Sequence, residues 1–240
     1  MLGDKVHHNA IKVQNLSFSY PDGTKVLNNV SFEVHAGENM ALLGHNGSGK
    51  TTLLYHLNGL LRGEGLIEIC GINLSYDNLT DVRKKVGLVF EDPNDQLFCP
   101  TVFEDIAFGP LNLGLSKEEV KETVNEMLEQ MEVSELALKS SHHLSLGQKK
   151  RVAIASVLAM RPQVLILDEP SSGLDPRGKK MLLDLLKKLE VTKLVVTHDL
   201  FFASALCSKA MVIAGGRIVV EGETRKILAD KEMLIKVSLS

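Results

Sequence analysis

The chain has 240 residues, is 44% hydrophobic and carries a formal net charge of -3 at pH 7, which suits one domain with a sizeable core. That charge gives no support for nucleic-acid binding, and no apolar run approaches the roughly 20 residues of a membrane span. The first ten residues contain no apolar signal region, and Cys70, Cys99 and Cys207 lack paired spacing, so we expect a cytosolic protein with reduced thiols.

Two stretches of strand character come first. Residues 11–18 alternate apolar and polar side chains, with a slip near Asn15, which predicts a half-buried strand. Residues 20–23 (YPDG) form a turn signal, and strand character resumes over residues 26–34. Because the connection is too short for a crossover, we expect antiparallel pairing. From spacing alone, Tyr20 either stacks on an adenine ring, a contact worth about 1–3 kcal/mol, or packs at a hairpin end.

A glycine-rich loop follows the apolar residues 40–43. Residues 44–51 (GHNGSGKT) fit a phosphate-binding loop in its strand–loop–helix context. Its glycines let successive N–H groups point at one anion, and the positive end of the next helix faces the same anion. Lys50 can reach the β- and γ-phosphates, and the Thr51 hydroxyl can ligate Mg²⁺. The loop residues expected at a nucleotide are Gly44, His45, Asn46, Gly47, Ser48, Gly49, Lys50, Thr51 and Thr52.

The middle of the chain changes from strands to helices. Residues 66–72 and 86–90 predict strands, and residues 91–96 predict a polar loop without regular structure. From residue 101 to about residue 132, apolar side chains recur at helical spacing, with Ser116 as N-cap and Glu119 three residues on. A further helix is expected from residue 148 to about residue 160. The cations at residues 149–151 in its first turn are interpreted as a solvated face.

Two carboxylates end the apolar run at residues 164–169 (VLILDE). A continuous apolar strand is buried on both faces, and its carboxyl end is where open α/β sheets bind ligands. Asp168 is then a partner for Mg²⁺, and Glu169 is an acceptor for the proton of attacking water. The alternative is a pair of exposed acids at a strand end.

The remaining elements follow in order. Residues 171–176 predict a turn and a helix entry, and an amphipathic helix is expected over residues 182–189. A buried strand is expected over residues 194–199, a hairpin over residues 210–220 and a last helix over residues 223–229. His198 ends the strand, where it can contact the γ-phosphate or orient water, although a lone histidine is more often structural.

The order of these motifs resembles the ATP-binding subunit of ATP-binding-cassette (ABC) transporters along nearly the whole chain. Residues 44–51 are similar to the Walker A motif, 144–148 (LSLGQ) to the family signature, and 164–169 to Walker B with its catalytic glutamate. Residues 172–175 resemble the D-loop and His198 the switch histidine. Tyr20 resembles the A-loop aromatic, which favours stacking.

The resemblance implies an α/β fold with a P-loop NTPase (RecA-like) ABC ATPase core, an N-terminal antiparallel β subdomain and an inserted α-helical subdomain. It implies one ABC ATPase domain over residues 1–240, with the insertion at residues 92–151. In this family two subunits enclose two ATP molecules with Mg²⁺. The implied catalytic residues are Lys50, Glu169 and His198, and the metal-binding residues are Thr51, Asp168 and Glu91. Ser145 and Gly147 serve the partner's nucleotide, and Gln148 and Asp175 are further nucleotide-binding residues.

Residues 92–98, 101–110 and 148–155 resemble energy-coupling-factor importers, which include the cobalt and nickel ATPases and those for water-soluble vitamins. The implied partners are a second ABC ATPase subunit, identical or paralogous, a transmembrane coupling subunit and a substrate-binding membrane subunit. The implied location is the cytoplasmic face of the cell membrane. One alternative is a non-transport ABC ATPase, but such proteins carry a long heptad-rich insertion or a second cassette, and this sequence shows neither. The other alternative is a weak nucleotide-binding partner of an active paralogue.

Two residues depart from the family pattern. Glu91 stands at the Q-loop glutamine; its carboxylate can offer oxygen to Mg²⁺ but adds negative charge beside the γ-phosphate. Leu146 stands where the signature usually has glycine, and its side chain can crowd the approach to the partner's phosphate. Two interpretations stay open: the less active half of an asymmetric pair, or tolerated variation.

Overall fold

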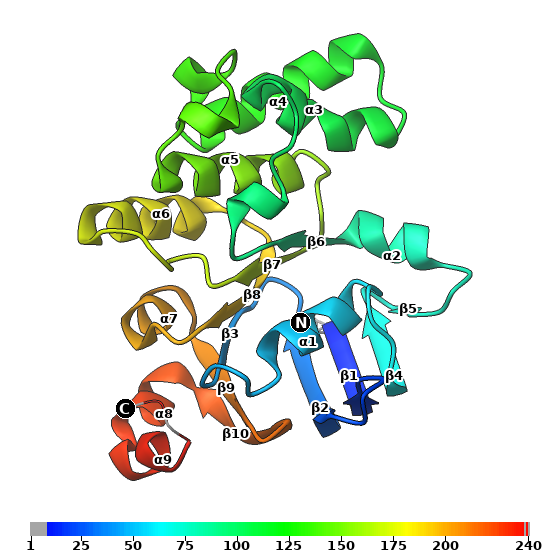
Figure 1. The fold of residues 1–240 in the computed structure, drawn as a ribbon, viewed down its shortest axis with the longest axis vertical. Helices are drawn as coiled ribbons and strands as arrows, with labels where there is room; N and C mark the ends of the chain where they lie inside the picture. The colour runs from blue at the N-terminus through cyan, green and yellow to red at the C-terminus, as the bar shows by residue number, and fades with distance from the viewer. Residues whose placement is uncertain (1–8, 238, 240) are drawn as a thin grey trace, which may run out of the picture.

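The computed structural model describes residues 9–237 and residue 239, so the expectation about a signal region falls largely on residues 1–8, which lie outside the described residues. Two sheets lie side by side, with helices packed around them (Figure 1). None of the helices in the described part of the chain combines the length and apolar character needed to cross a membrane.

The smaller sheet is antiparallel, with the order β2-β1-β4-β5. Its strands are β1 (Asn9–Ser19), β2 (Lys25–His35), β4 (Glu64–Ile69) and β5 (Ile72–Asn73). The expected slip near Asn15 is a bulge: the register shifts between Val13 and Leu16, and Asn15 takes a left-handed φ of 53°. The prediction of one strand over residues 66–72 was wrong. A turn at Cys70 and Gly71, with φ of 48° and 80°, folds this stretch into a hairpin.

The larger sheet has the order β10-β9-β3-β8-β7-β6, and all neighbours in it are parallel except β10 and β9. Its strands are β3 (Asn39–Leu43), β6 (Val86–Val89), β7 (Val164–Asp168), β8 (Thr192–Thr197), β9 (Lys209–Ala214) and β10 (Arg217–Glu223). The expected antiparallel pairing therefore holds for the first two strands, whereas β3 joins this second sheet.

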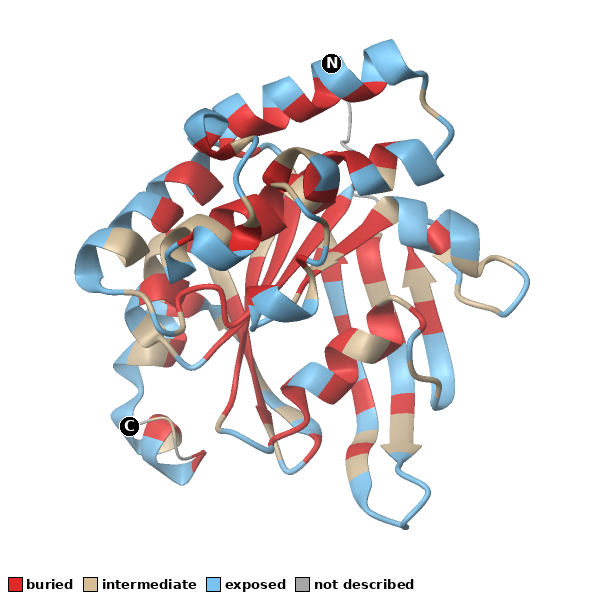
Figure 2. Cartoon of the chain, turned by 45° about the horizontal axis from the view of Figure 1, so that its top comes forward, coloured by how far each residue is buried: buried red, intermediate tan, exposed pale blue. Residues whose placement is uncertain are grey.

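Both faces of the central strands β3, β7 and β8 are buried, as the apolar runs predicted, whereas the edge strand β10 is partly exposed (Figure 2). In β7, Leu165 and Leu167 pack into one hydrophobic cluster, while Val164 and Ile166 pack into the other. The two clusters lie on opposite faces because successive side chains of a strand alternate.

Nine α-helices occur among residues 9–237. They are α1 (Lys50–Leu57), α2 (Leu79–Lys85), α3 (Val102–Asn112), α4 (Lys117–Gln130), α5 (Leu146–Leu158), α6 (Pro176–Lys188), α7 (Leu200–Leu206), α8 (Thr224–Ala229) and α9 (Lys231–Lys236). Helices α3, α4 and α5 pack together beyond the β6 edge of the larger sheet (Figure 1). Ser116 and Glu119 form the expected capping box of α4.

Several helix predictions need correction. Helix α5 begins at Leu146 rather than residue 148, because Ser145 and Gln148 form a capping box. Helix α6 runs without a break from Pro176, at the expected helix entry, rather than only from residue 182, since Asp175 caps it and proline suits the first turn. Helices α2, α7 and α9 were not predicted, and a 3₁₀ turn (Pro93–Asp95) interrupts the loop expected at residues 91–96. Only Val82 of α2 is buried, which explains its weak periodicity.

The cation run at residues 149–151 is not a solvated face. Lys150 is 4% exposed and Arg151 is 9% exposed, and only Lys149 reaches outward, where its Nζ donates to Asn94 Oδ1 at 2.7 Å. Arg151 is buried because its guanidinium donates to the carbonyls of Met131 and Glu132, which lie just after α4. Local sequence does not reveal these distant carbonyl partners.

Candidate active site

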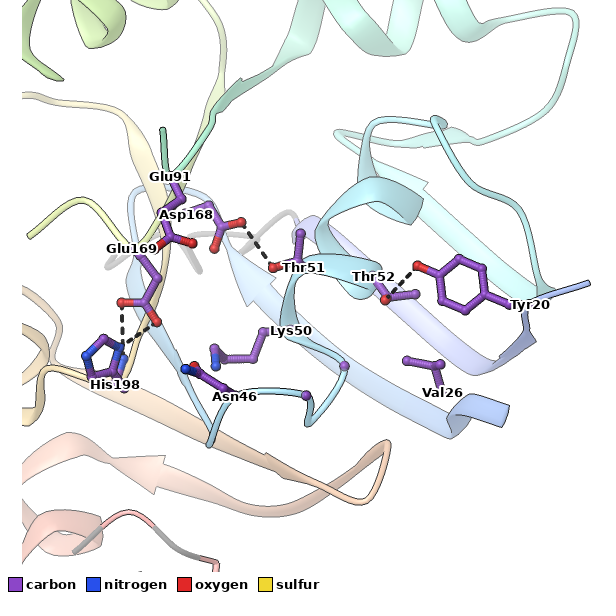
Figure 3. A pocket seen from close by; sticks show the side chains of 12 residues that line it. Tyr20, Val26, Asn46, Lys50, Thr51, Thr52, Glu91, Asp168, Glu169 and His198 are labelled. Carbon is purple, nitrogen blue, oxygen red and sulfur yellow. Dashed lines mark hydrogen bonds and ion pairs between the residues drawn. The ribbon is translucent and has the colours of Figure 1, made fainter. Parts of the chain in front are cut away.

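The carboxyl ends of β3, β6, β7 and β8 border one cavity of about 460 Å³ (Figure 3). It is lined by Tyr20, Val26, Asn46, Gly47, Gly49, Lys50, Thr51, Thr52, Glu91, Asp168, Glu169 and His198. All of these except Val26 were predicted. Val26 lies at the start of β2, and no sequence signal points to it, because only the fold brings this strand beside the glycine loop.

The glycine loop presents hydrogen-bond donors. Gly49 takes a left-handed φ of 105° and precedes α1 without any side-chain cap, so the first N–H groups of that helix lack partners of their own. A Cβ at Gly49 would lie 3.1 Å from the Val26 carbonyl oxygen, which explains the glycine. The buried hydroxyl of Ser48 has no hydrogen-bond partner in the described part of the chain. This donor set suits phosphate oxygens.

Lys50 supplies the positive charge of the loop. Its side chain is buried, and its Nζ donates to the carbonyls of Gly44 at 2.8 Å and His45 at 3.1 Å. Burial lowers the pKa of Lys50, although the nearby carboxylates of Glu169, Asp168 and Glu91 act in the opposite direction. Gly44 and His45 thus hold the lysine rather than line the cavity.

Thr51 and Asp168 face each other across the cavity. The Thr51 hydroxyl donates to Asp168 Oδ2 at 3.2 Å. Burial raises the pKa of Asp168 to about 6, with further raising by the charges of Glu169 and Glu91, against a lowering by the Thr51 hydrogen bond and Lys50. Within residues 9–237 and 239, no three His, Cys, Asp or Glu side chains form a metal site by themselves. One carboxylate and a hydroxyl nevertheless fit Mg²⁺, which takes its remaining ligands from phosphates and water.

Glu169 follows β7 with an unusual backbone, at a left-handed φ of 42°. Its carboxylate is buried and lies against the end of β8 (Figure 3). Oε1 lies 2.9 Å from His198 Nδ1, and Oε2 accepts from the Thr197 hydroxyl at 3.0 Å. Since an ionised carboxylate only accepts, Nδ1 carries the proton in this pair. Thr197 was missed, because a threonine at a strand end is ordinary in sequence.

Tyr20 lies at the end of the β1–β2 hairpin and lines the cavity. Its stacking on an adenine ring stays a prediction. Its hydroxyl lies 3.2 Å from Thr52 Oγ1, and its ring packs edge-on against Phe18 at 5.0 Å between centroids. The side chain is 38% exposed. These contacts fix the aromatic ring at the rim of the cavity.

Glu91 lies just beyond β6, on the Asp168 side of the cavity. Its Oε1 accepts a weak hydrogen bond from the Ser172 hydroxyl at 3.4 Å. The residue also lines an adjoining cavity of about 430 Å³ that includes Lys150 and Leu146. The departure from glutamine therefore brings a third carboxylate, beside Asp168 and Glu169, to this cavity.

The other predicted residues do not line the first cavity. Ser145, Gly147, Gln148 and Asp175 line a second one of about 660 Å³ at the N-terminal ends of α5 and α6. Leu146 lies there too, 38% exposed, with its Cδ2 2.7 Å from the position that a Cβ on Gly173 would take. The Leu146 side chain thus packs against the turn at Gly173. One chain carries two separate sets of predicted nucleotide contacts.

The fold and the first cavity define a nucleotide-binding protein of the phosphate-loop class. The family model described as "ABC transporter" matches residues 27–172. The chain therefore belongs to the ABC transporter family, as an ATP-binding subunit. It is 48% identical to the energy-coupling factor transporter ATP-binding protein EcfA of Methanocaldococcus jannaschii, covering 95% of this chain and 84% of that protein. It is 46% identical to EcfA of Methanosphaera stadtmanae with the same coverage.

Solved structures agree. The cbiO1 protein of Clostridium perfringens, described as part of the ABC transporter complex cbiONQ, superposes with a TM-score of 0.85 at 38% identity, covering 97% of this chain and 95% of that one. The ATP-binding cassette MJ0796, a dimer in a post-hydrolysis state bound to ADP and Pi, superposes with a TM-score of 0.80 at 32% identity, covering 90% and 99%. The predicted α/β phosphate-loop fold is confirmed.

Proposed function

We propose that this protein is the ATP-hydrolysing subunit of an importer of the energy-coupling-factor type. The observation that carries the proposal is the meeting of Lys50, Asp168, Glu169 and His198 at one cavity, where the strands β3, β7 and β8 end. The EcfA relatives support the transporter class, so the non-transport alternatives are not favoured.

In this proposal the chain's own groups divide the chemistry of hydrolysis. Lys50 and the N–H groups of the glycine loop bind phosphate oxygens, and Tyr20 stacks on the adenine. Thr51 and Asp168 hold Mg²⁺, with Glu91 as a further oxygen donor. The bound ion supplies positive charge that offsets the phosphate charge.

Glu169 accepts the proton of the attacking water in the same proposal. Each carboxylate oxygen has two acceptor sites, so Glu169 can keep its bonds to His198 and Thr197 and still bind water. His198, 57% exposed in its side chain, is free on its other face to steady the γ-phosphate.

A second ATPase subunit, identical or paralogous, completes each site. Ser145, Gly147, Gln148 and Asp175 line a different cavity from Lys50, so they serve a nucleotide bound to the partner. The dimeric MJ0796 neighbour supports this arrangement.

A membrane subunit docks in an apolar groove of about 440 Å³ between α2, α3 and α5. Phe98 and Phe108 line this groove, 66% and 49% exposed, and pack edge-on at 5.0 Å. The groove adjoins the loop that begins at Glu91. In this proposal the chain is one domain over residues 1–240, and residues 92–151 form a subdomain inserted in it. The loop and this subdomain transmit the motion of the ATPase to the membrane subunit. The protein is then peripheral on the cytoplasmic face of the cell membrane.

The test is steady-state ATP hydrolysis by the purified chain, alone and with a candidate paralogue, together with pull-down from membranes in mild detergent. We expect ATP hydrolysis and co-purification of membrane subunits, and we expect Phe98→Ala with Phe108→Ala to lose those subunits while hydrolysis by the isolated chain persists. A chain that binds no ATP, or that recovers no membrane protein, would rule the proposal out.

A further inference from the structure

Lys150 is a buried cation to which the proposed mechanism gives no role. It lies near the N-terminal end of α5, five residues after the N-cap Ser145, and is 4% exposed. Burying an ammonium costs several kcal/mol unless hydrogen bonds and opposite charges compensate. Its position therefore requires specific partners.

Those partners belong to the two loops at the active site. The Nζ of Lys150 donates to the carbonyl of Glu91 at 3.1 Å and to the carbonyl of Glu169 at 3.0 Å. One amino group thus ties the helix that starts at the signature segment to the ends of β6 and β7. These three segments lie far apart in sequence and meet only in the fold.

The bond to the Glu169 carbonyl falls at a strained point of the chain. A residue other than glycine with left-handed φ costs about 1 kcal/mol or more, and Glu169 has a φ of 42°. That backbone aims the carboxylate at His198 and Thr197. A donor fixed to the carbonyl stabilises the strained conformation and, with it, the direction of the side chain.

The charge of Lys150 also suits this position. Burial lowers its pKa, whereas the carboxylates of Glu91, Glu169, Asp92 and Asp168 act in the opposite direction. The ammonium therefore stands among carboxylates whose mutual repulsion it offsets, and it is a second buried amino group beside this end of the sheet, with Lys50.

We propose that Lys150 is a positioning residue for ATP hydrolysis, which acts by fixing the Glu169 carbonyl from the signature helix. This inference rests on the proposed function, because it requires Glu169 to act on water. It needs no contact between Lys150 and the nucleotide.

The test compares Lys150→Met, which keeps the length but removes the donors and charge, with Lys150→Gln, which keeps a shorter donor. Lys149→Gln is the matched control, because it removes a neighbouring charge whose Nζ donates to Asn94 Oδ1 and to neither of the two carbonyls that Lys150 binds. For each variant kcat for ATP and the Kd for ATP with Mg²⁺ are measured separately. We expect Lys150→Met to lower kcat at least about tenfold with Kd within about threefold, Lys150→Gln to fall between, and Lys149→Gln to stay within about twofold of wild type.

A kcat for Lys150→Met within about twofold of wild type overturns the inference, as does an equal change in kcat and Kd, which would mean general damage to the site. If Lys150→Met does not fold, the kcat and Kd of Lys150→Gln test the inference by the same criteria. If neither variant folds, Lys150 has a structural role only, and the inference is overturned. A wild-type chain that binds ATP without hydrolysing it refutes the proposed function instead.

Discussion

His198 Nδ1 lies 2.9 Å from Glu169 Oε1, across the gap between the ends of β8 and β7. The two residues are 29 positions apart in sequence, and each directly follows one of two neighbouring parallel strands. Because the Thr197 hydroxyl holds the other carboxylate oxygen, Glu169 is fixed at both oxygens by the end of β8.

Replacing Glu169 by Gln removes the proposed base and keeps the shape of the side chain. Hydrolysis should fall by about 10²–10⁴-fold, the usual contribution of general base catalysis, while ATP binding persists and favours the closed dimer. Phosphate release, nucleotide binding and size-exclusion chromatography with ATP measure these effects. Glu122→Gln, at an exposed position of α4, is the control, and unchanged turnover in Glu169→Gln would refute the role of Glu169.

Thr197→Val removes one of the donors that orient Glu169. A lost hydrogen bond of about 0.5–1.5 kcal/mol predicts a kcat lowered by about two- to tenfold, with little change in ATP affinity. The control is Thr192→Val at the other end of β8, where the hydroxyl accepts from the Gly37 N–H. That variant should lower the melting temperature and spare kcat. Equal kcat losses in both variants would contradict a specific role for Thr197.

Asp168 makes stability depend on pH. Its pKa is raised to about 6 from 3.8, so the folded state binds the extra proton between about pH 4 and pH 6, and the free energy of unfolding falls as pH rises through that window. Above it the ionised carboxylate costs up to about 3 kcal/mol.

Asp168→Asn should therefore raise the free energy of unfolding by about 1–3 kcal/mol at pH 7.5, without Mg²⁺ or nucleotide, and by less at about pH 4. Urea unfolding at both pH values measures the difference. A variant that is less stable than wild type at pH 7.5 would show that the hydrogen bond from Thr51 outweighs the burial of charge.

Tyr20→Ala should weaken ATP binding by about 1–3 kcal/mol, because it removes the proposed stacking surface. Tyr20→Phe should cost less, since it loses only the contact with Thr52. Titration with a fluorescent ATP analogue measures both. Tyr76→Ala is a suitable control, because Tyr76 is 76% exposed and does not line the cavity. Equal losses for Tyr20→Ala and Tyr76→Ala would argue against stacking.

Glu91→Gln should strengthen ATP binding in the absence of Mg²⁺, because it removes a negative charge near the phosphates. Glu91 is exposed and screened by water, so the expected gain is about two- to tenfold and should shrink as Mg²⁺ is added. Binding measured over a Mg²⁺ series tests this, and an affinity that does not depend on residue 91 at any Mg²⁺ concentration would make the substitution a tolerated variation.

The strands of the parallel sheet and the active-site loops were predictable because their signals are local. Apolar runs predicted burial on both faces of β7, and the GHNGSGKT spacing located the phosphate loop. Capping boxes of α4 and α5 lie within four residues, although that of α5 was overlooked. Helix α2 was not predicted because it buries only one side chain, Val82. The turn at Cys70 and Gly71 was not predicted because it interrupts an otherwise regular apolar stretch.

The sequence by itself determined the order of motifs, the phosphate loop and the acids that end β7, since each depends on neighbours a few residues apart. Only the tertiary structure decided that Ser145 and Lys50 line different cavities, that Thr197 orients Glu169, and that Lys150 is buried against two loops. These relationships depend on which strand ends meet and which carbonyls a buried ammonium can reach. Long-range packing decides both of these relationships, and the local periodicity of the sequence does not reveal that packing.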